Sequence, residues 1–268
     1  MLKILLNRTY RQLFAAQVIA LLGTGLLTVA LGLLAYDLAG DRAGAVLGTA
    51  LAIKMIAYVG LAPLANAIGE RLPRKAVLIG ADLVRASTAV CLPFIDAVWQ
   101  IYLLIFLLQA ASATFTPAFQ ATIPDILPDE KDYTKALSLS RLAYDLENLI
   151  SPALAGFLLL VISYHWLFAG TVIGFLCSAA LVWLTAVPER PGDTARPFLD
   201  RLTRGVRIYL ATPRLRGLLA LNMAASAAGA FVIVNTVVLV RTVHSGSESD
   251  VAVALAAFGA GSITAALR

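Results

Sequence analysis

The sequence predicts an all-α polytopic membrane protein, and three observations support this fold class. Hydrophobic residues make up 60% of the 268 residues, charged residues only 14%, and the mean hydropathy is +0.84, too apolar for a soluble domain. Apolar stretches of roughly 20 residues, enough to cross a bilayer core of about 30 Å, recur along the chain. The period-two alternation of a membrane β-barrel is absent, which leaves helices to satisfy the backbone hydrogen bonds in lipid.

The expected membrane spans follow the apolar stretches in chain order. They cover residues 13–38, 44–67, 76–95, 98–119, 139–162, 165–187, 215–240 and 251–267. The first stretch follows basic residues, as in a secretory leader, but it is too long for the core of a signal peptide and no small-residue cleavage site ends it, so we expect a retained span. Cys91 and Cys177 fall inside spans without metal-ligand spacing, which predicts small side chains packed in a core.

Basic residues predict the orientation of these spans. Lys and Arg gather in the N-terminal segment and in every second loop after it, whereas the intervening loops hold only Arg42 and Arg241. Because positive residues accumulate on the cytoplasmic side, we expect a multi-pass protein of the cell (cytoplasmic) membrane with its N-terminus inside. The basic residues behind the net charge of +5 are distributed among these loops rather than gathered in one patch, so nucleic acid is not an expected partner.

Two loops carry recognisable motifs, and the first joins the second and third spans. It is a tight charged turn, Gly69-Glu70-Arg71-Leu72-Pro73-Arg74-Lys75. This turn resembles the signature Gly-x-x-x-Asp-Arg-x-Gly-Arg-Arg between helices 2 and 3 of the major facilitator superfamily of secondary transporters. Glu70 stands for the acid, and the basic positions are matched by Arg71, Arg74 and Lys75. Asn66 and Pro73 stand where the two glycines are expected.

The loop after the fourth span strengthens the resemblance. Residues 117–130, PAFQATIPDILPDE, are similar to the loop between helices 4 and 5 in one branch of that superfamily, the proton-linked exporters of macrolides, other drugs and siderophores. The resemblance implies secondary active transport by alternating access, with proton-coupled efflux of a drug-like or siderophore-like molecule. It also implies an inner gating loop formed by Glu70, Arg71, Arg74 and Lys75.

The resemblance further implies the major facilitator fold, which has twelve spans in two six-helix bundles. We expect the N-terminal bundle at 1–187, a cytoplasmic linker at 188–213, and at 214–268 the incomplete start of the C-terminal bundle, with helix 7 and most of helix 8. In the linker, apolar residues recur at helical spacing opposite Arg201, Arg204 and Arg207, which predicts an amphipathic helix on the membrane surface. We expect either a fragment of a longer protein, which we favour, or a short relic.

Ionisable residues inside the spans are the candidate site, because each costs about 2.5–3.5 kcal/mol on insertion scales. The expected substrate or ion-coupling residues are Lys54, Asp82, Arg85, Glu147 and Asn148. Glu147 is the candidate for the acid that takes up a proton. Structural roles stay open as alternatives: Lys54 in a structural pair, Asp82 and Arg85 as a buried pair that joins helices, and Glu147 as a counter-charge to Lys54 or Arg141.

Smaller features add to the resemblance. The run Ser151-Pro152-Ala153-Leu154-Ala155-Gly156 resembles the antiporter motif Gly-Pro-x-x-Gly-Gly, and Pro152 would kink the fifth span. The arginine that is usual in helix 4 of the family is absent, and the polar residues there are Gln109, Ser112, Thr114 and Thr116. In the first span, close helix approach is favoured by Gly23, Gly25 and Gly32.

The sequence shows no nucleophile–base constellation, phosphate-binding loop or metal-ligand cluster, so we expect no enzyme and no cofactor, with the proton gradient as the energy source. The expected partners are the lipid bilayer, a small-molecule substrate and protons, and the expected full-length state is a monomer. Transport of a lysophospholipid or nutrient is the alternative within the same class. Two other classes stay open: a polytopic membrane enzyme with Lys54, Asp82 and Glu147 as its acid–base site, and a non-transporting fragment that binds another membrane subunit.

Overall fold

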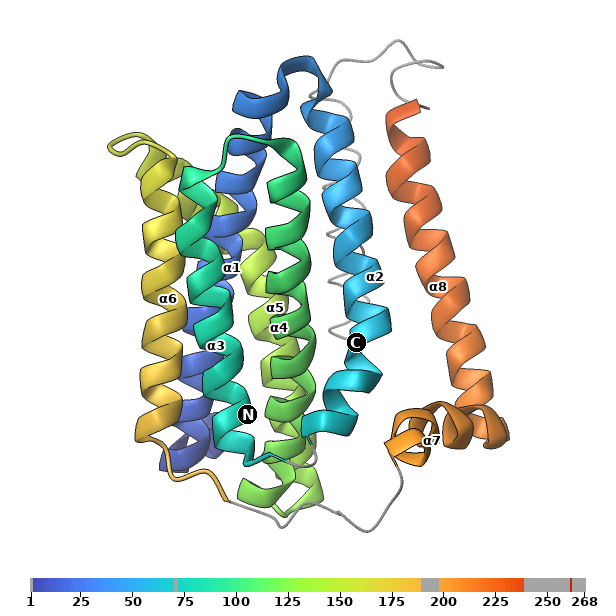
Figure 1. Cartoon of the computed structure of the whole chain (residues 1–268). Helices are drawn as coiled ribbons and strands as arrows, with labels where there is room; N and C mark the ends of the chain where they lie inside the picture. The colour runs from blue at the N-terminus through green and yellow to red at the C-terminus, as the bar shows by residue number, and fades with distance from the viewer. Residues whose placement is uncertain (1, 70–71, 189–197, 239–260, 262–268) are drawn as a thin grey trace. The chain divides into compact units, whose positions relative to one another are not determined.

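The computed structural model describes residues 2–69, 72–188, 198–238 and 261 (Figure 1). The chain divides into two compact units, Met1–Thr203 and Arg204–Arg268. The first unit contains the residues of the candidate site.

The described residues are helical almost throughout and contain no strand. The bounds are α1 Arg8–Ala39, α2 Ala43–Gly69, α3 Arg74–Cys91, α4 Val98–Ile126, α5 Glu130–Leu159, α6 His165–Leu184, α7 Phe198–Ala211 and α8 Pro213–Val238. Three short 3-10 helices add η1 Leu2–Leu6, η2 Gly40–Arg42 and η3 Leu92–Phe94. The predicted all-α fold is confirmed. Each expected span up to 215–240 overlaps a helix, whereas the span at 251–267 lies outside the described residues apart from Gly261.

Several of these helices are long and apolar enough to cross a membrane. Among the described residues the candidates are Arg8–Ala39, Arg74–Phe94, Val98–Ile126 and His165–Leu184, and a shorter apolar stretch covers Gly44–Tyr58 of α2. The fold is therefore that of a polytopic membrane protein. Helix α7 lies in the segment where an amphipathic linker helix is expected, and its place on a membrane surface stays a prediction.

Local sequence explains where the helices begin and end. The side chain of Asn7 accepts a hydrogen bond from the backbone N–H of Tyr10, which caps α1. Asp129 caps α5 in the same way, accepting from Lys131 and Asp132. Helix α1 ends at Gly40, whose φ of 53° suits a residue without a side chain.

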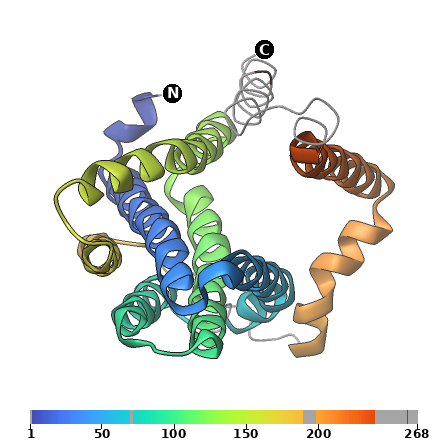
Figure 2. The same ribbon diagram turned by 90° about the horizontal axis from the view of Figure 1, so that it is seen from above.

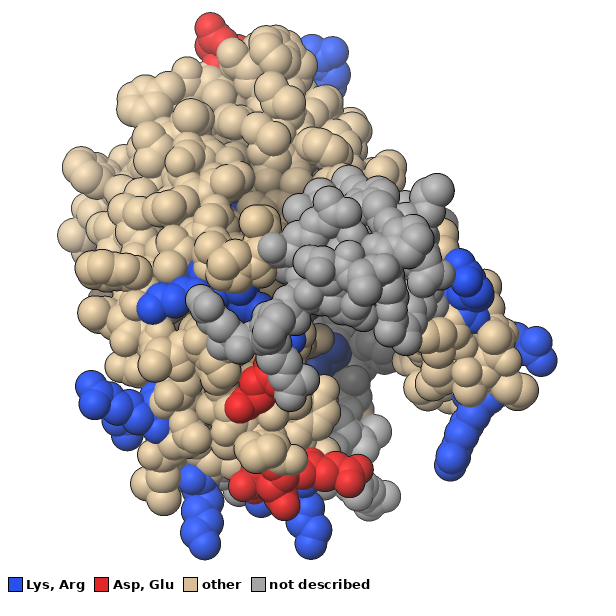
Figure 3. Space-filling model, turned by 60° about the horizontal axis from the view of Figure 1, so that its bottom comes forward, with Lys and Arg blue, Asp and Glu red and all other residues tan. Residues whose placement is uncertain are grey.

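Consecutive helices of the first unit run in opposite directions, so its turns alternate between two ends. The N-terminus, the α2–α3 turn and the α4–α5 turn lie at one end, and the α1–α2, α3–α4 and α5–α6 turns lie at the other (Figure 1). The Lys and Arg side chains visible on the first unit gather mainly toward the former end, which comes forward in Figure 3. The N-terminus therefore lies at the more basic end, and this is the end that the sequence predicts to face the cytoplasm.

Helix α1 is the central element of the first unit. It lies between α6 and α4 and also packs on α2 and α5, whereas α3 packs on α4 and α6 (Figure 2). Glycines permit the closest approaches, as expected for Gly23 and Gly25. A Cβ at Gly23 would lie 3.2 Å from the carbonyl oxygen of Thr171 on α6, and one at Gly25 would overlap the side chain of Ser151 on α5. A Cβ at Gly32 would meet no atom of the described residues within 4 Å.

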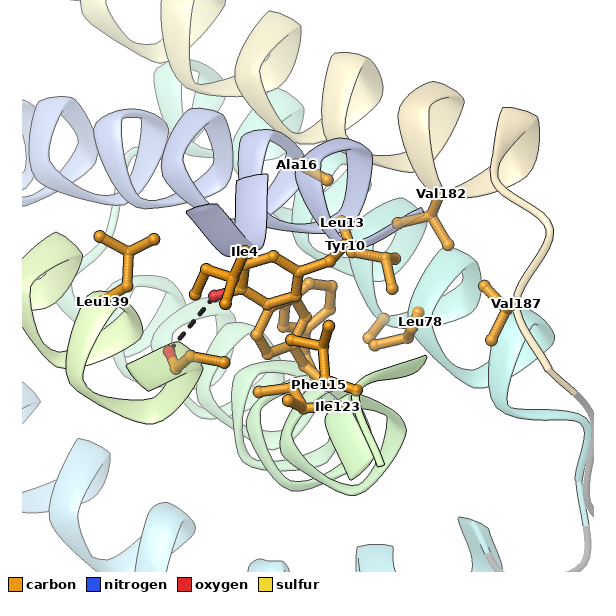
Figure 4. Close-up of a cluster of buried hydrophobic side chains, with 14 of the residues drawn as sticks. Ile4, Tyr10, Leu13, Ala16, Leu78, Phe115, Ile123, Leu139, Val182 and Val187 are labelled. Carbon is orange, nitrogen blue, oxygen red and sulfur yellow. Dashed lines mark hydrogen bonds between the residues drawn. The ribbon is translucent and has the colours of Figure 1, made fainter. Parts of the chain in front are cut away.

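Two large apolar clusters fill most of the interior of the first unit, and a small third one consists of Ala20, Ala86 and Phe175. One large cluster includes Tyr10, Leu78 and Phe119 (Figure 4), and the other lies farther along the same helices and includes Leu34 and Ile101. Between the two large clusters, buried polar side chains interrupt the helices at Gln17, Asp82, Arg85, Gln109, Ser140, Ser151, Thr171 and Ser178. The middle layer of the interior therefore holds most of the buried polar side chains.

The prediction that both cysteines pack in a core is wrong. Cys91 and Cys177 do lie in α3 and α6, but both are exposed. Each lies on the outward side of its helix, because the inward positions are taken by residues such as Leu78 and Phe175. An outward apolar position is normal for a helix that faces lipid rather than water.

Candidate functional site

Lys54 on α2 and Glu147 on α5 are both partly buried, and they lie near enough to interact electrostatically. The distance from the ammonium to the carboxylate exceeds the 4.0 Å limit of an ion pair. Arg141, the other expected counter-charge of Glu147, instead forms an exposed ion pair of 3.5 Å with Asp145 of its own helix. Lys54 and Glu147 therefore lie near each other but do not form an ion pair.

A chain of three hydroxyl groups lies beside this pair. The Tyr58 hydroxyl donates to Thr116 Oγ1 at 3.0 Å, and Thr116 Oγ1 lies 3.3 Å from the Tyr144 hydroxyl. The three residues come from α2, α4 and α5. Tyr58 is four residues after Lys54 and Tyr144 three before Glu147, so each tyrosine shares a helix face with one charged residue. Helices α2 and α5 thus each carry one charged residue and, one helical turn away, one tyrosine hydroxyl.

Asp82 and Arg85 form an ion pair on one face of α3, and their exposed fractions are 0% and 5%. Ser178 of α6 donates to Asp82 Oδ2 at 2.7 Å. The guanidinium carbon of Arg85 lies 4.4 Å from the ring centroid of Phe115 and 4.7 Å from that of Phe175, distances typical of cation–π contacts. These contacts tie α3 to α4 and α6.

The expected gating loop is only partly described, since Glu70 and Arg71 lie outside the described residues. Arg74 opens α3 and bonds the carboxylate of Asp125 near the end of α4. It also donates to the carbonyl oxygen of Ala121, at 2.7 Å. Lys75 is partly buried in the first turn of α3. The α2–α3 turn is thereby attached to the C-terminal end of α4.

The antiporter-like run lies within α5, where the helix meets α1. Ser151 is 1% exposed and packs against Gly25, and its Oγ finds no hydrogen-bond partner in the described part of the chain. Pro152 continues the helix, and Gly156 is exposed. Asn148 also lies in α5, but its side chain is outside the described residues. By helical spacing, Ser151 lies on the same side of α5 as Glu147, four residues before it, and Tyr144, seven residues before it.

Sequence reasoning missed four residues of these networks: Tyr58, Asp125, Tyr144 and Ser178. Tyr58 and Tyr144 could have been found from their helical spacing to Lys54 and Glu147. Asp125 falls inside the recognised run 117–130 but carries no local sign of its partner. Ser178 has no local signal at all, because its partner is 96 residues away. No cluster of metal-binding side chains occurs within the described ranges.

Comparisons with known proteins place these helices in a family. The chain matches the profile of the Major Facilitator Superfamily over residues 13–267. It is 26% identical to macrolide efflux protein A of Streptococcus pyogenes over 215 residues, which cover 78% of this chain and 52% of that protein. It is 28% identical over 123 residues to the uncharacterized MFS-type transporter YfiS of Bacillus subtilis (strain 168), covering 46% of this chain and 29% of that protein.

A third relative is the multidrug resistance protein MdtG of Enterobacter lignolyticus (strain SCF1). The identity is 26% over 190 residues, which cover 70% of this chain and 45% of that protein. The chain spans about half the length of the macrolide efflux protein that it matches. Since the family profile covers nearly all of its residues, the chain belongs to the Major Facilitator Superfamily.

Proposed function

We propose that the protein is a secondary active transporter that exports a drug-like or siderophore-like small molecule by alternating access, driven by the proton gradient. The observation that carries the proposal is the Lys54–Glu147 arrangement. Two opposite charges lie partly buried on facing helices of a membrane domain, and they interact without forming an ion pair. Charges in such a place are costly and are retained where they bind ions or substrate. The efflux and drug-resistance names of the relatives support the same class.

In this proposal Glu147 is the proton-binding group and Lys54 is its electrostatic partner. When Glu147 is ionised, its carboxylate attracts the ammonium of Lys54 and any cationic group of a substrate. Proton uptake neutralises the carboxylate, so both attractions are lost and a bound cation is released. Because the two states differ in net charge by one proton, the gradient across the membrane drives the cycle in one direction. Each step uses only groups on α2 and α5.

The proposed gate lies at the end where the N-terminus and the α2–α3 turn are found. Arg74 holds this turn against Asp125 and Ala121 of α4, so the turn and α4 would move as one body. Glu70, Arg71 and Lys75 are proposed to complete the gate, and the same end is proposed to face the cytoplasm. The protein is proposed to work as a monomer in the bilayer when its full length is present.

Two roles remain for Asp82 and Arg85, direct substrate or ion coupling and structural support. Their geometry favours support. Both charges are almost completely buried, and they are engaged by Ser178, Phe115 and Phe175. A substrate could reach them only after these contacts had broken. We propose that the pair fixes α3 to α6 and leaves exchange of protons and substrate to Lys54 and Glu147.

The test compares Glu147→Gln and Lys54→Ala with Arg42→Ala, which alters an exposed residue of η2. Export of a fluorescent dye is followed in membrane vesicles from cells that produce the native protein, with an imposed proton gradient. We expect Glu147→Gln to lower gradient-driven export at least about 100-fold, because a required proton-transfer group is removed. Lys54→Ala is expected to raise KM, and Arg42→Ala to leave export unchanged. Equal export by all three variants would refute the assignment.

A further inference from the structure

The hydroxyl chain Tyr58–Thr116–Tyr144 is not used by the proposed proton and substrate steps, yet it lies one helical turn from Lys54 and Glu147. It links α2 to α5 by way of α4. Among the described residues, α2 packs along α4 and has no extensive packing of its own on α5. The hydroxyl chain therefore connects two helices that make little direct contact with each other.

We propose that Tyr58, Thr116 and Tyr144 are positioning residues that hold α2 and α5 apart, so that Lys54 and Glu147 stay open to a ligand instead of closing into a direct ion pair. This inference rests on the proposed function, because it assigns the hydroxyls a role at the same two charges. A carboxylate that has not closed onto Lys54 can accept a cationic amine, or a hydronium-like proton carrier in its absence.

The geometry gives three reasons for this assignment. The bridge has a fixed length, since its two hydrogen bonds of 3.0 and 3.3 Å meet at one atom, Thr116 Oγ1. Tyr58 donates to that atom, which leaves the proton of Thr116 able to point toward Tyr144. Without such a spacer, opposite charges in a low-dielectric interior attract strongly enough to close on each other. The observed separation beyond ion-pair distance is what a spacer would maintain.

Thr114 offers a matched control on the same helix. Its hydroxyl donates to the carbonyl oxygen of Ala110 in the preceding turn of α4, at 2.9 Å. Thr114→Val and Thr116→Val thus make the same chemical change two residues apart, and only the second removes the bridge. Thr116→Ser keeps the hydroxyl and serves as the conservative variant. Tyr58→Phe breaks one end of the bridge and gives a second route if Thr116→Val fails to fold.

The experiment measures how fast a hydrophobic carbodiimide labels Glu147 in the purified native protein, with labelled peptides quantified by mass spectrometry. The reagent attacks protonated carboxyl groups, so a carboxylate held in an ion pair with Lys54 reacts slowly. Glu130, exposed in the first turn of the same helix, is the internal reference. We expect Thr116→Val and Tyr58→Phe to slow labelling of Glu147 by about 2- to 10-fold, the effect of one hydrogen bond. Thr114→Val and Thr116→Ser are expected to match the wild type.

The Lys54→Met background completes the test. If the hydroxyls act through the spacing of the pair, adding Thr116→Val to Lys54→Met changes nothing further. Slowing that persists without Lys54, or that is equal for Thr114→Val, would overturn the inference. The labelling does not depend on transport, so it separates two failures. Unchanged export by Glu147→Gln would refute the proposed function, whereas unchanged labelling by Thr116→Val and Tyr58→Phe would refute the spacer.

Discussion

Two acid–base pairs occupy the middle of the first unit, and they differ in almost every physical respect. Asp82 and Arg85 lie three residues apart on one helix, are nearly inaccessible, and form a direct ion pair that further side chains support. Lys54 and Glu147 lie on different helices, are partly exposed, and remain beyond ion-pair distance. These properties are the reason that we propose the first pair as a structural link between helices and the second as the site.

The difference shows that charge inside a membrane domain does not by itself mark a binding residue. Buried charges are tolerated when paired and hydrogen-bonded, and removal of one partner is then costly because the other is left alone. Charges that are accessible and incompletely paired keep the freedom to exchange a proton or ligand. Burial and pairing separate the two roles, and neither can be read from the sequence.

The largest expected effect comes from removing one partner of the buried pair, Asp82 and Arg85. Arg85→Met leaves Asp82 buried and unpaired, so we expect the free energy of unfolding to fall by about 3–5 kcal/mol. Lys54→Met removes a partly exposed charge that is not in an ion pair, and we expect a change within about 1 kcal/mol. Unfolding by dodecyl sulfate in bicelles, followed by tryptophan fluorescence, measures both. Similar losses for the two variants would remove the distinction between the pairs.

A smaller effect tests whether Asp82 depends on α6. Ser178→Ala removes the hydroxyl that donates to Asp82 Oδ2, and we expect a loss of about 1–3 kcal/mol because a buried charged acceptor loses a donor. Ser112→Ala is the control, since its hydroxyl bonds the carbonyl oxygen of Leu108 in its own helix. The same unfolding assay applies. If Ser178→Ala proved no worse than Ser112→Ala, the link between α3 and α6 would not matter to stability.

The smallest effect extends the comparison to a polar pair between the last turns of α1 and the residue just before α6. The Tyr164 hydroxyl donates to Asp37, and partial burial, with this carboxylate, raises the pKa of Tyr164 from 10.0 to about 12. A raised pKa stabilises the fold fully below pH 10, and that contribution is lost as the pH rises toward about 12. Spectrophotometric titration should show one fewer late-ionising tyrosine in Tyr164→Phe than in the wild type. Ionisation of Tyr164 near pH 10 would show that the bond is absent in solution.

Much of the architecture was predictable because it depends on local composition. The lengths of the apolar stretches predicted the helices, and the charged turn at Gly69–Lys75 predicted the family. The candidate residues Lys54 and Glu147 were also found from sequence alone, since an ionisable residue in an apolar span is conspicuous. Ser178, by contrast, is an ordinary serine in an apolar helix until its partner is known.

By itself, the sequence determined an all-α membrane fold, the family, and a short set of charges worth testing. Hydropathy and short motifs are properties of contiguous residues, and they hold whatever the rest of the chain does. Only the tertiary structure decided that Asp82 and Arg85 are sealed while Lys54 and Glu147 are open, and that three hydroxyls bridge α2 to α5. Those facts depend on which faces of separate helices meet, and helix packing brings together residues that lie far apart in the chain.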